Sequence, residues 1–352
     1  MKIIRIFLTM FSVVLAFYLL NLGQALLLPL VIAGAIAYII NILAHVISRI
    51  SIFRISLPKP LSMALAVTLT VTSITLTVQL ITENVTRVLQ KAPGYQENLE
   101  ARILALCNRL GFQELPSLRE MLSQFDLSGY LLSFGGMVSA LVSSMGIIII
   151  YLIFIFLEQR TFGAKIRALF SQKSEQDDAF NLVNQINQDI GSYIGIKFVT
   201  STTTGVISYL VLQCVGVDFA GFWAVLIFLL NFIPTIGSII ATAFPSLLAL
   251  VQFETLTPFI VTISILAVVQ FCIGSLIEPK LMGNRLNLSP LVILLSLGLW
   301  GTIWGIAGMF LCVPITVIIM IVCAYFPETR AVAVALSSNG ELPVGPRRTS
   351  RN

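Results

Sequence analysis

The hydrophobic residues of this sequence are gathered into blocks of about twenty, and this feature most limits how the chain can fold. A helix of about 20 apolar residues crosses the hydrocarbon core of a bilayer once. Charged residues make up 11% of the chain, against roughly 25% in a soluble domain. The pattern therefore predicts an all-α membrane protein with about eight hydrophobic segments, which cover residues 6–22, 26–47, 61–82, 135–157, 196–216, 219–252, 258–277 and 290–325.

The composition also excludes some classes of partner. The net charge is +5, but the basic residues lie between apolar blocks, where they set the orientation in the membrane. We therefore expect no nucleic-acid partner. Four of the five cysteines lie inside apolar blocks, so no disulfide framework is predicted. The N-terminal run resembles a signal peptide, but a second apolar run begins at Leu26, which favours a retained first helix.

Basic residues in the short loops predict the topology. Lys2 and Arg5 precede the first block, and Arg49, Arg54 and Lys59 follow the second. The positive-inside rule places these segments in the cytoplasm. The expected order is three spanning helices (1–82), an extracytoplasmic helical segment (83–134), a fourth spanning helix (135–157), a cytoplasmic helical segment (158–195), a core of interrupted helices (196–325) and a cytoplasmic tail (326–352).

The sixth and eighth blocks are too long for one crossing and contain internal prolines and glycines. If the sixth block crosses once, Lys280 and Arg285 face the outside. If it is a re-entrant hairpin, both charges face the cytoplasm, and the eighth block must then be a hairpin of opposite orientation. The second alternative satisfies the positive-inside rule in every short loop. Inverted repeats with interrupted segments indicate a substrate site near the bilayer midplane.

The sixth block is interrupted at residues 231–237, which read Asn-Phe-Ile-Pro-Thr-Ile-Gly. Proline removes a backbone donor, and Gly237 is expected to supply the flexibility to turn. An interruption inside a membrane must be buried in protein or line a watery cavity. The candidate residues for a tip that contacts substrate are Asn231, Pro234, Thr235 and Gly237. The alternative is a simple proline kink between packed helices.

A second motif follows the seventh block and contains Glu278, Pro279, Lys280 and Gly283. An ionisable group at the end of an apolar helix is costly unless it is paired or hydrated. Glu278 is therefore expected either to bind a proton or cation, or to form a structural ion pair with Lys280 or Arg285. The residue types alone do not separate these two roles.

The eighth block contains the third motif. Gly301, Gly305 and Gly308 form a small-residue tip, and Pro314 is predicted to break the return limb. Close glycine spacing lets helices approach tightly, so packing alone also accounts for it. A weak internal similarity supports a repeat, because Gly237 precedes Pro245 as Gly308 precedes Pro314.

These motifs together resemble the autoinducer-2 exporter family of permeases, over essentially the whole chain. The resemblance rests on residues 231–237, 278–283, 288–290 and 300–308, with Pro314. It implies a bacterial inner-membrane transporter that is a homo-oligomer and has a small-molecule or ion substrate. Members are associated with export of autoinducer-2 and others with sodium/proton antiport, so the resemblance leaves the substrate open.

Enzymatic classes find little support in the sequence. The single histidine, His45, has no glycine-flanked serine to pair with, and no glycine-rich lysine loop for a nucleotide is present. We expect no catalytic residue, no metal and no cofactor, with the lipid bilayer as the surroundings. A channel and a structural membrane scaffold remain as alternatives to a secondary transporter.

Overall fold

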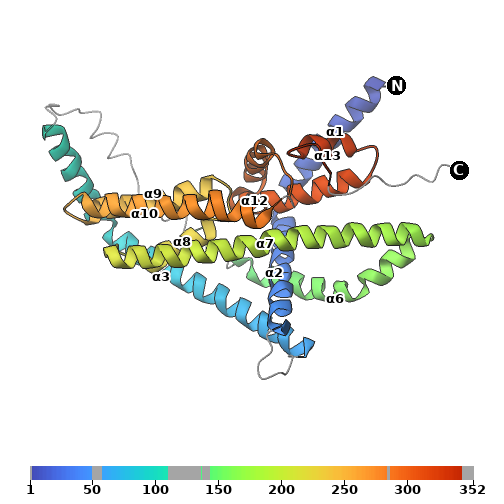
Figure 1. Cartoon of the computed structure of the whole chain (residues 1–352), viewed down its shortest axis with the longest axis horizontal. Helices are drawn as coiled ribbons and strands as arrows, with labels where there is room; N and C mark the ends of the chain where they lie inside the picture. The colour runs from blue at the N-terminus through green and yellow to red at the C-terminus, as the bar shows by residue number, and fades with distance from the viewer. Residues whose placement is uncertain (1, 50–57, 110–135, 137–142, 284–285, 343–352) are drawn as a thin grey trace. The chain divides into compact units, whose positions relative to one another are not determined.

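The computed structural model describes residues 2–49, 58–109, 136, 143–283 and 286–342 of the chain. Over these ranges the regular structure is helical, apart from an isolated antiparallel bridge between Leu288 and Ser337 (Figure 1). The predicted all-α fold is therefore confirmed. The helices are α1 (Lys2–Leu22), α2 (Gln24–Arg49), α3 (Lys59–Arg109), α6 (Met145–Leu169), α7 (Lys173–Val215), α8 (Ala220–Leu230), α9 (Ile236–Gln252), α10 (Thr257–Phe271), the π-helix η1 (Cys272–Ile277), α11 (Glu278–Met282), α12 (Pro290–Tyr325) and α13 (Arg330–Leu336).

Within the described residues, six helical stretches are long and apolar enough to cross a membrane. Large apolar side chains are exposed along them, as expected of surfaces that contact lipid chains. The helices α8 and α9 are shorter than a single crossing. The six stretches are α2, the first part of α3 (Lys59–Val88), α6, α7, the run from α10 to α11 (Thr257–Met282) and α12.

Two helices are far longer than a bilayer crossing. α3 has 51 residues and α7 has 43, so they extend about 77 and 65 Å at ~1.5 Å per residue. The hydrocarbon core is about 30 Å thick. Into the predicted helical segment 83–134, α3 continues without a break as far as Arg109. The local helix breakers Pro93 and Gly94 therefore do not end it, and residues 110–135 lie outside the described part.

The chain divides into two compact units. Unit 1 comprises Met1–Ala66, Met145–Phe198 and Pro279–Asn352, and unit 2 comprises Val67–Ser144 and Val199–Glu278. In unit 1, α2 packs against α6 and α12 packs against α13. The predicted core of residues 196–325 is thus divided between the units.

In unit 2, the sixth hydrophobic block forms a helical hairpin. α8 ends at Leu230, residues 231–235 turn, and α9 packs back against α8 and beside α10 (Figure 1). α8 is apolar on all sides, which is typical of a helix enclosed by others. The buried side chains of Phe222, Ile227, Ala241 and Leu266 form the core between these helices. The re-entrant placement of this hairpin in the bilayer stays a prediction.

In unit 1, the eighth block also folds back on itself. The backbone of α12 is non-helical at Trp304 and Gly305. The hydroxyl of Ser296 donates a hydrogen bond of 3.1 Å to the carbonyl of Cys312 and contacts the hydroxyl of Thr316. In a straight helix, residues 20 apart are separated by about 30 Å. The contacts therefore require two antiparallel limbs, and α12 is a second helical hairpin.

Disulfide cross-linking tests the folded-back form of α12. In a variant without the native cysteines, Ser296→Cys combined with Thr316→Cys should form a disulfide on mild oxidation, because the two hydroxyl groups are in contact. Intramolecular cross-linking is measured by a reducible mobility shift, or by mass spectrometry of the joined peptides. The matched control pairs Ser296→Cys with Ile319→Cys, on the exposed side of the same limb. Equal reaction of both pairs, or of neither, would contradict the hairpin.

Candidate functional site

The turn between α8 and α9 carries four predicted site residues. Asn231 is buried, with 5% of its surface exposed, and its amide donates a hydrogen bond of 3.1 Å to the hydroxyl of Ser201 on α7. Gly237 is also buried, Pro234 is half-buried and Thr235 is exposed. A buried hydrogen bond therefore joins the turn to the spanning helix α7.

Thr235 has a backbone conformation that β-branched residues rarely adopt, with φ 58° and ψ −59°. The N–H of Ile236 donates to the carbonyl of Pro234 across it at 2.6 Å, which makes the rarer, strained form of γ-turn. Such strain costs about 1–3 kcal/mol and is retained mainly where the surroundings enforce it, often at functional sites. The strain supports a role for this turn beyond joining two helices.

Gly237 serves close approach, and not the flexibility expected from the sequence. It lies in the first turn of α9, where an added Cβ would lie 1.8 Å from the carbonyl oxygen of Leu230 and 3.2 Å from the Cβ of Ile233. Because no side chain fits at 1.8 Å, α9 can begin this close to the end of α8 only with glycine at this position.

The second hairpin is closed in the same way. A Cβ on Gly308 would lie 1.9 Å from the carbonyl oxygen of Trp300 and 3.1 Å from the Cβ of Trp304. The chain turns at Gly305, whose φ of 60° and ψ of −141° suit glycine and strain other residues. In each hairpin a glycine thus touches the carbonyl at the end of the first limb. This shared construction supports the predicted internal repeat.

The predicted break at Pro314 is wrong. Residues 306–325 of α12 are helical, and the reversal occurs at Trp304 and Gly305. Membrane helices tolerate proline because nearby groups can bond the carbonyl that loses its partner. Gly301, predicted to be part of the small-residue tip, lies on the first limb of the hairpin. An added Cβ there would meet the Cε of Met309 at 2.9 Å, and this flexible side chain can move.

The motif around Glu278 follows an unusual helical segment. η1 is a π-helix, a form that appears frequently at functional sites. Glu278 is half-buried at its end, Pro279 and Lys280 are exposed, and Gly283 has φ 54° where α11 ends. Arg285 lies outside the described residues. The coupling role and the ion-pair role of Glu278 both stay predictions.

A buried row of polar side chains along α7 was not predicted. Apart from the adjacent pair Thr200 and Ser201, its members lie three or four residues apart, so they share one face of the helix. Lys197 is 6% exposed and Thr204 is fully buried. The same spacing is visible in the block 196–216, and could have been recognised there beneath the apolar composition. The row consists of Lys197, Thr200, Ser201, Thr204 and Ser208.

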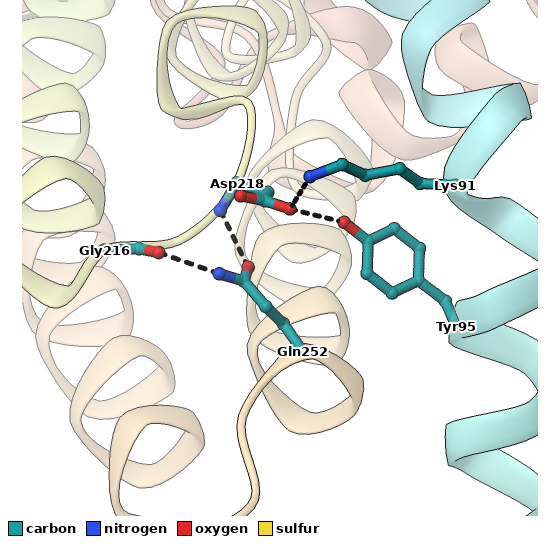
Figure 2. A network of polar contacts seen from close by, with 5 residues as sticks. All are labelled: Lys91, Tyr95, Gly216, Asp218 and Gln252. Atoms are coloured by element: carbon teal, nitrogen blue, oxygen red, sulfur yellow. Dashed lines mark hydrogen bonds and ion pairs between the residues drawn. The ribbon is translucent and has the colours of Figure 1, made fainter.

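A polar network in unit 2 connects α3, the segment between α7 and α8, and the end of α9 (Figure 2). It lies at the base of the first hairpin, opposite the tip. Asp218, between α7 and α8, accepts hydrogen bonds of 2.6 Å from Lys91 and 2.7 Å from Tyr95 of α3. Gln252 at the end of α9 accepts a bond of 2.7 Å from the N–H of Asp218 and donates one of 2.8 Å to the carbonyl of Gly216. The network therefore sets where the limbs of this hairpin begin and end.

The network perturbs the ionisation of two groups. Partial burial alone would raise the pKa of Asp218, but the hydrogen bonds from Lys91 and Tyr95 and the charge of Lys91 outweigh it and hold that pKa below its usual value. Burial, and next the hydrogen bond to Asp218, raise the pKa of Tyr95 above its usual value. Asp218 is therefore the carboxylate, and Tyr95 the neutral donor, across the physiological pH range.

Removing the charge of Asp218 should weaken the protein at neutral pH. The pKa of Asp218 is lower in the folded protein than in the unfolded chain. Its carboxylate therefore contributes its full stabilisation above the unfolded pKa of about 4, and this stabilisation is lost as the pH falls through the folded pKa. Asp218→Asn should cost about 1–2 kcal/mol at pH 7, and the difference from wild type should shrink toward pH 3. Thermal unfolding of detergent-solubilised protein, repeated from pH 7 to pH 3, measures the cost of the substitution and its change with pH.

Glu158→Gln is the matched control for this carboxylate. Glu158 pairs with Lys165 on α6, and both side chains are more than half exposed, so its removal should have almost no effect. A constant difference between wild type and Asp218→Asn from pH 7 to pH 3 would rule out the ionic origin.

The two hairpin glycines should respond alike to substitution. Gly237→Ala and Gly308→Ala each force a Cβ against a carbonyl and should destabilise the protein by about 1–3 kcal/mol. Gly298→Ala on α12 is the control, because nothing lies within 4 Å of an added Cβ there, and should be neutral or stabilising. Thermal unfolding by size-exclusion chromatography measures the effect. Equal stability of all three variants would contradict the close contacts.

Comparison with known proteins identifies the family of this chain. A family model described as AI-2E family transporter matches residues 6–328. A protein of Haemophilus influenzae, named provisionally as a transport protein, is 35% identical over 70% of this chain and 73% of its own length. A similarly named protein of Borreliella burgdorferi is 31% identical over 73% of this chain and 70% of its own.

A third relative carries a more specific name. The AI-2 transport protein TqsA of Escherichia coli is 25% identical over 89% of both chains. The family match covers most of the chain, including both hairpins and the α7 row. With its helical spans and two closed hairpins, this multi-pass membrane protein belongs to the AI-2E transporter family.

Proposed function

We propose that this protein is a secondary transporter that moves a small solute across the bacterial inner membrane. The observation that carries the proposal is the buried hydrogen bond between Asn231 at the first hairpin tip and Ser201 on α7. A polar turn held against a polar face of a spanning helix offers donors and acceptors inside an apolar protein. Such broken helices commonly hold substrate in transporters.

For the solute we propose a small signalling molecule of the AI-2 kind, moved outward. The support is the likeness to TqsA, which extends over 89% of both chains. Exchange of sodium for protons is the second candidate. It is favoured by Glu278, a half-buried carboxylate that follows the π-helix at the end of a spanning helix.

The proposed orientation places both termini and residues 48–60, 158–195 and 278–289 in the cytoplasm, with residues 83–134 outside. It follows from the basic residues of the short loops. We further propose that the protein is a homo-oligomer surrounded by lipid, with no nucleic-acid partner and no enzymatic activity.

Proteoliposomes test the transport function directly. Purified protein should release entrapped AI-2 at a rate that reaches a maximum as the AI-2 concentration inside the vesicles rises. Asn231→Ala should lower that rate about tenfold, which corresponds to about 1.4 kcal/mol and is the size of one buried hydrogen bond. A pH-sensitive dye in the same vesicles reports sodium-driven proton movement for the second candidate.

Asn84→Ala is the matched control, because the Asn84 amide bonds the carbonyl of Leu80 within its own helix. Its flux should equal that of wild type. Flux that rises without saturation would indicate a channel. Vesicles with neither AI-2 flux nor proton movement, despite correctly assembled protein, would leave a structural membrane protein as the better description.

A further inference from the structure

A polar hollow lies in unit 2 beside the network of Figure 2. Its volume is about 390 Å³, which falls within the range of small-molecule sites. It is open, and its walls on α3 follow directly after the apolar stretch Lys59–Val88, so dissolved compounds can reach it. The lining consists of one face of α3 (Gln90, Lys91, Gly94, Tyr95 and Asn98) together with Asp218 from the segment between α7 and α8.

The groups around this hollow have hydrogen-bonding capacity to spare. Asp218 accepts the bonds from Lys91 and Tyr95 through the same oxygen, Oδ2, and within the described ranges its Oδ1 accepts none. An ammonium carries three protons, and that of Lys91 donates one bond to a described residue. The exposed amide of Gln90 makes no hydrogen bond to the part of the chain that the structure describes. Donors and acceptors are therefore both available along one wall.

The two charges at the hollow compensate each other. The Nζ of Lys91 and the Oδ2 of Asp218 are 2.6 Å apart, and the other lining residues are uncharged at neutral pH. A charged ligand would therefore meet no counter-charge that lacks a partner. A hydroxyl group donates and accepts at once, so several hydroxyls on one molecule can match amide, ammonium and carboxylate groups together.

We propose that this hollow binds a small, neutral, polyhydroxylated compound of the monosaccharide or cyclitol kind. The site is distinct from the turn between α8 and α9, because its residues adjoin the base of the first hairpin. In the proposed orientation it faces the outside. Gly94 keeps the hollow open, since nothing lies within 4 Å of an added Cβ at that position and a longer side chain there would occupy the ligand's space.

Ligand-observed NMR tests the binding without any transport. D-ribose, D-glucose and myo-inositol are each titrated against purified protein in phosphatidylcholine nanodiscs, because sugar-headed detergents would compete. Saturation-transfer difference spectra should show saturable binding of at least one of them in the millimolar range. Gly94→Leu should weaken this binding about tenfold or more by filling the hollow. Gln90→Ala should weaken it about fivefold, the share of one hydrogen bond.

Gly146→Leu is the matched control. Gly146 is an exposed helical glycine of α6, in unit 1, and an added Cβ there also meets nothing within 4 Å. This variant should bind as wild type does. Absence of saturable binding for all three probes, or unchanged affinity in Gly94→Leu, would overturn the proposal. If Gly94→Leu does not assemble, as judged by size-exclusion chromatography, Gln90→Ala decides in its place.

Two further probes test the chemical class. Acetate and ethanolamine carry one charge each and should bind more weakly than the preferred polyhydroxylated probe. Tighter binding of either would assign the hollow to a charged ligand and overturn the proposal. A lipid headgroup is the other source of clustered hydroxyls, so the titration is repeated in nanodiscs that contain phosphatidylglycerol. Loss of probe binding there would make the hollow a headgroup site, whereas unchanged binding supports a dissolved ligand.

Discussion

Backbone N–H and C=O groups inside a bilayer have no water to bond, so a chain that reverses there must be closed by other parts of the protein. Each of the two reversals in this structure closes around a glycine that lies close to a backbone carbonyl. Gly237 lies against the carbonyl of Leu230, and Gly308 lies against the carbonyl of Trp300. Because a single methyl group would separate the limbs, these contacts determine how tightly each hairpin closes and which side chains stand at its tip.

α7 supplies buried polar side chains to the protein interior. Its buried row presents hydroxyls in unit 2, where Ser201 accepts a hydrogen bond from Asn231, and the buried side chain of Lys197 in unit 1. The network around Asp218 holds the far end of the first hairpin, so its tip and its base are fixed by different interactions. A solute that binds near the tip of the first hairpin would therefore meet polar groups supplied by α7.

Part of the site was predictable because its signals are local. Asn231, Gly237 and Gly308 lie in interruptions of apolar blocks, which are visible in one dimension. Pro314 was misjudged, because the helix absorbs a proline whose effect depends on its neighbours. Lys197 had a signal in its spacing from Ser201 and Thr204, but the apolar composition of the block obscured it. No signal linked Lys91 to Asp218, which are 127 residues apart.

The sequence by itself determined that the chain is helical and crosses a membrane, because about twenty apolar residues in a row are stable in hydrocarbon only as a helix. It also determined where the helices are interrupted, since proline and glycine act on their own segment. The tertiary structure decided which interruption becomes a closed turn, which glycine is indispensable and which polar side chains are buried together. Those outcomes depend on distances between segments far apart in the chain, and composition carries no information about such distances.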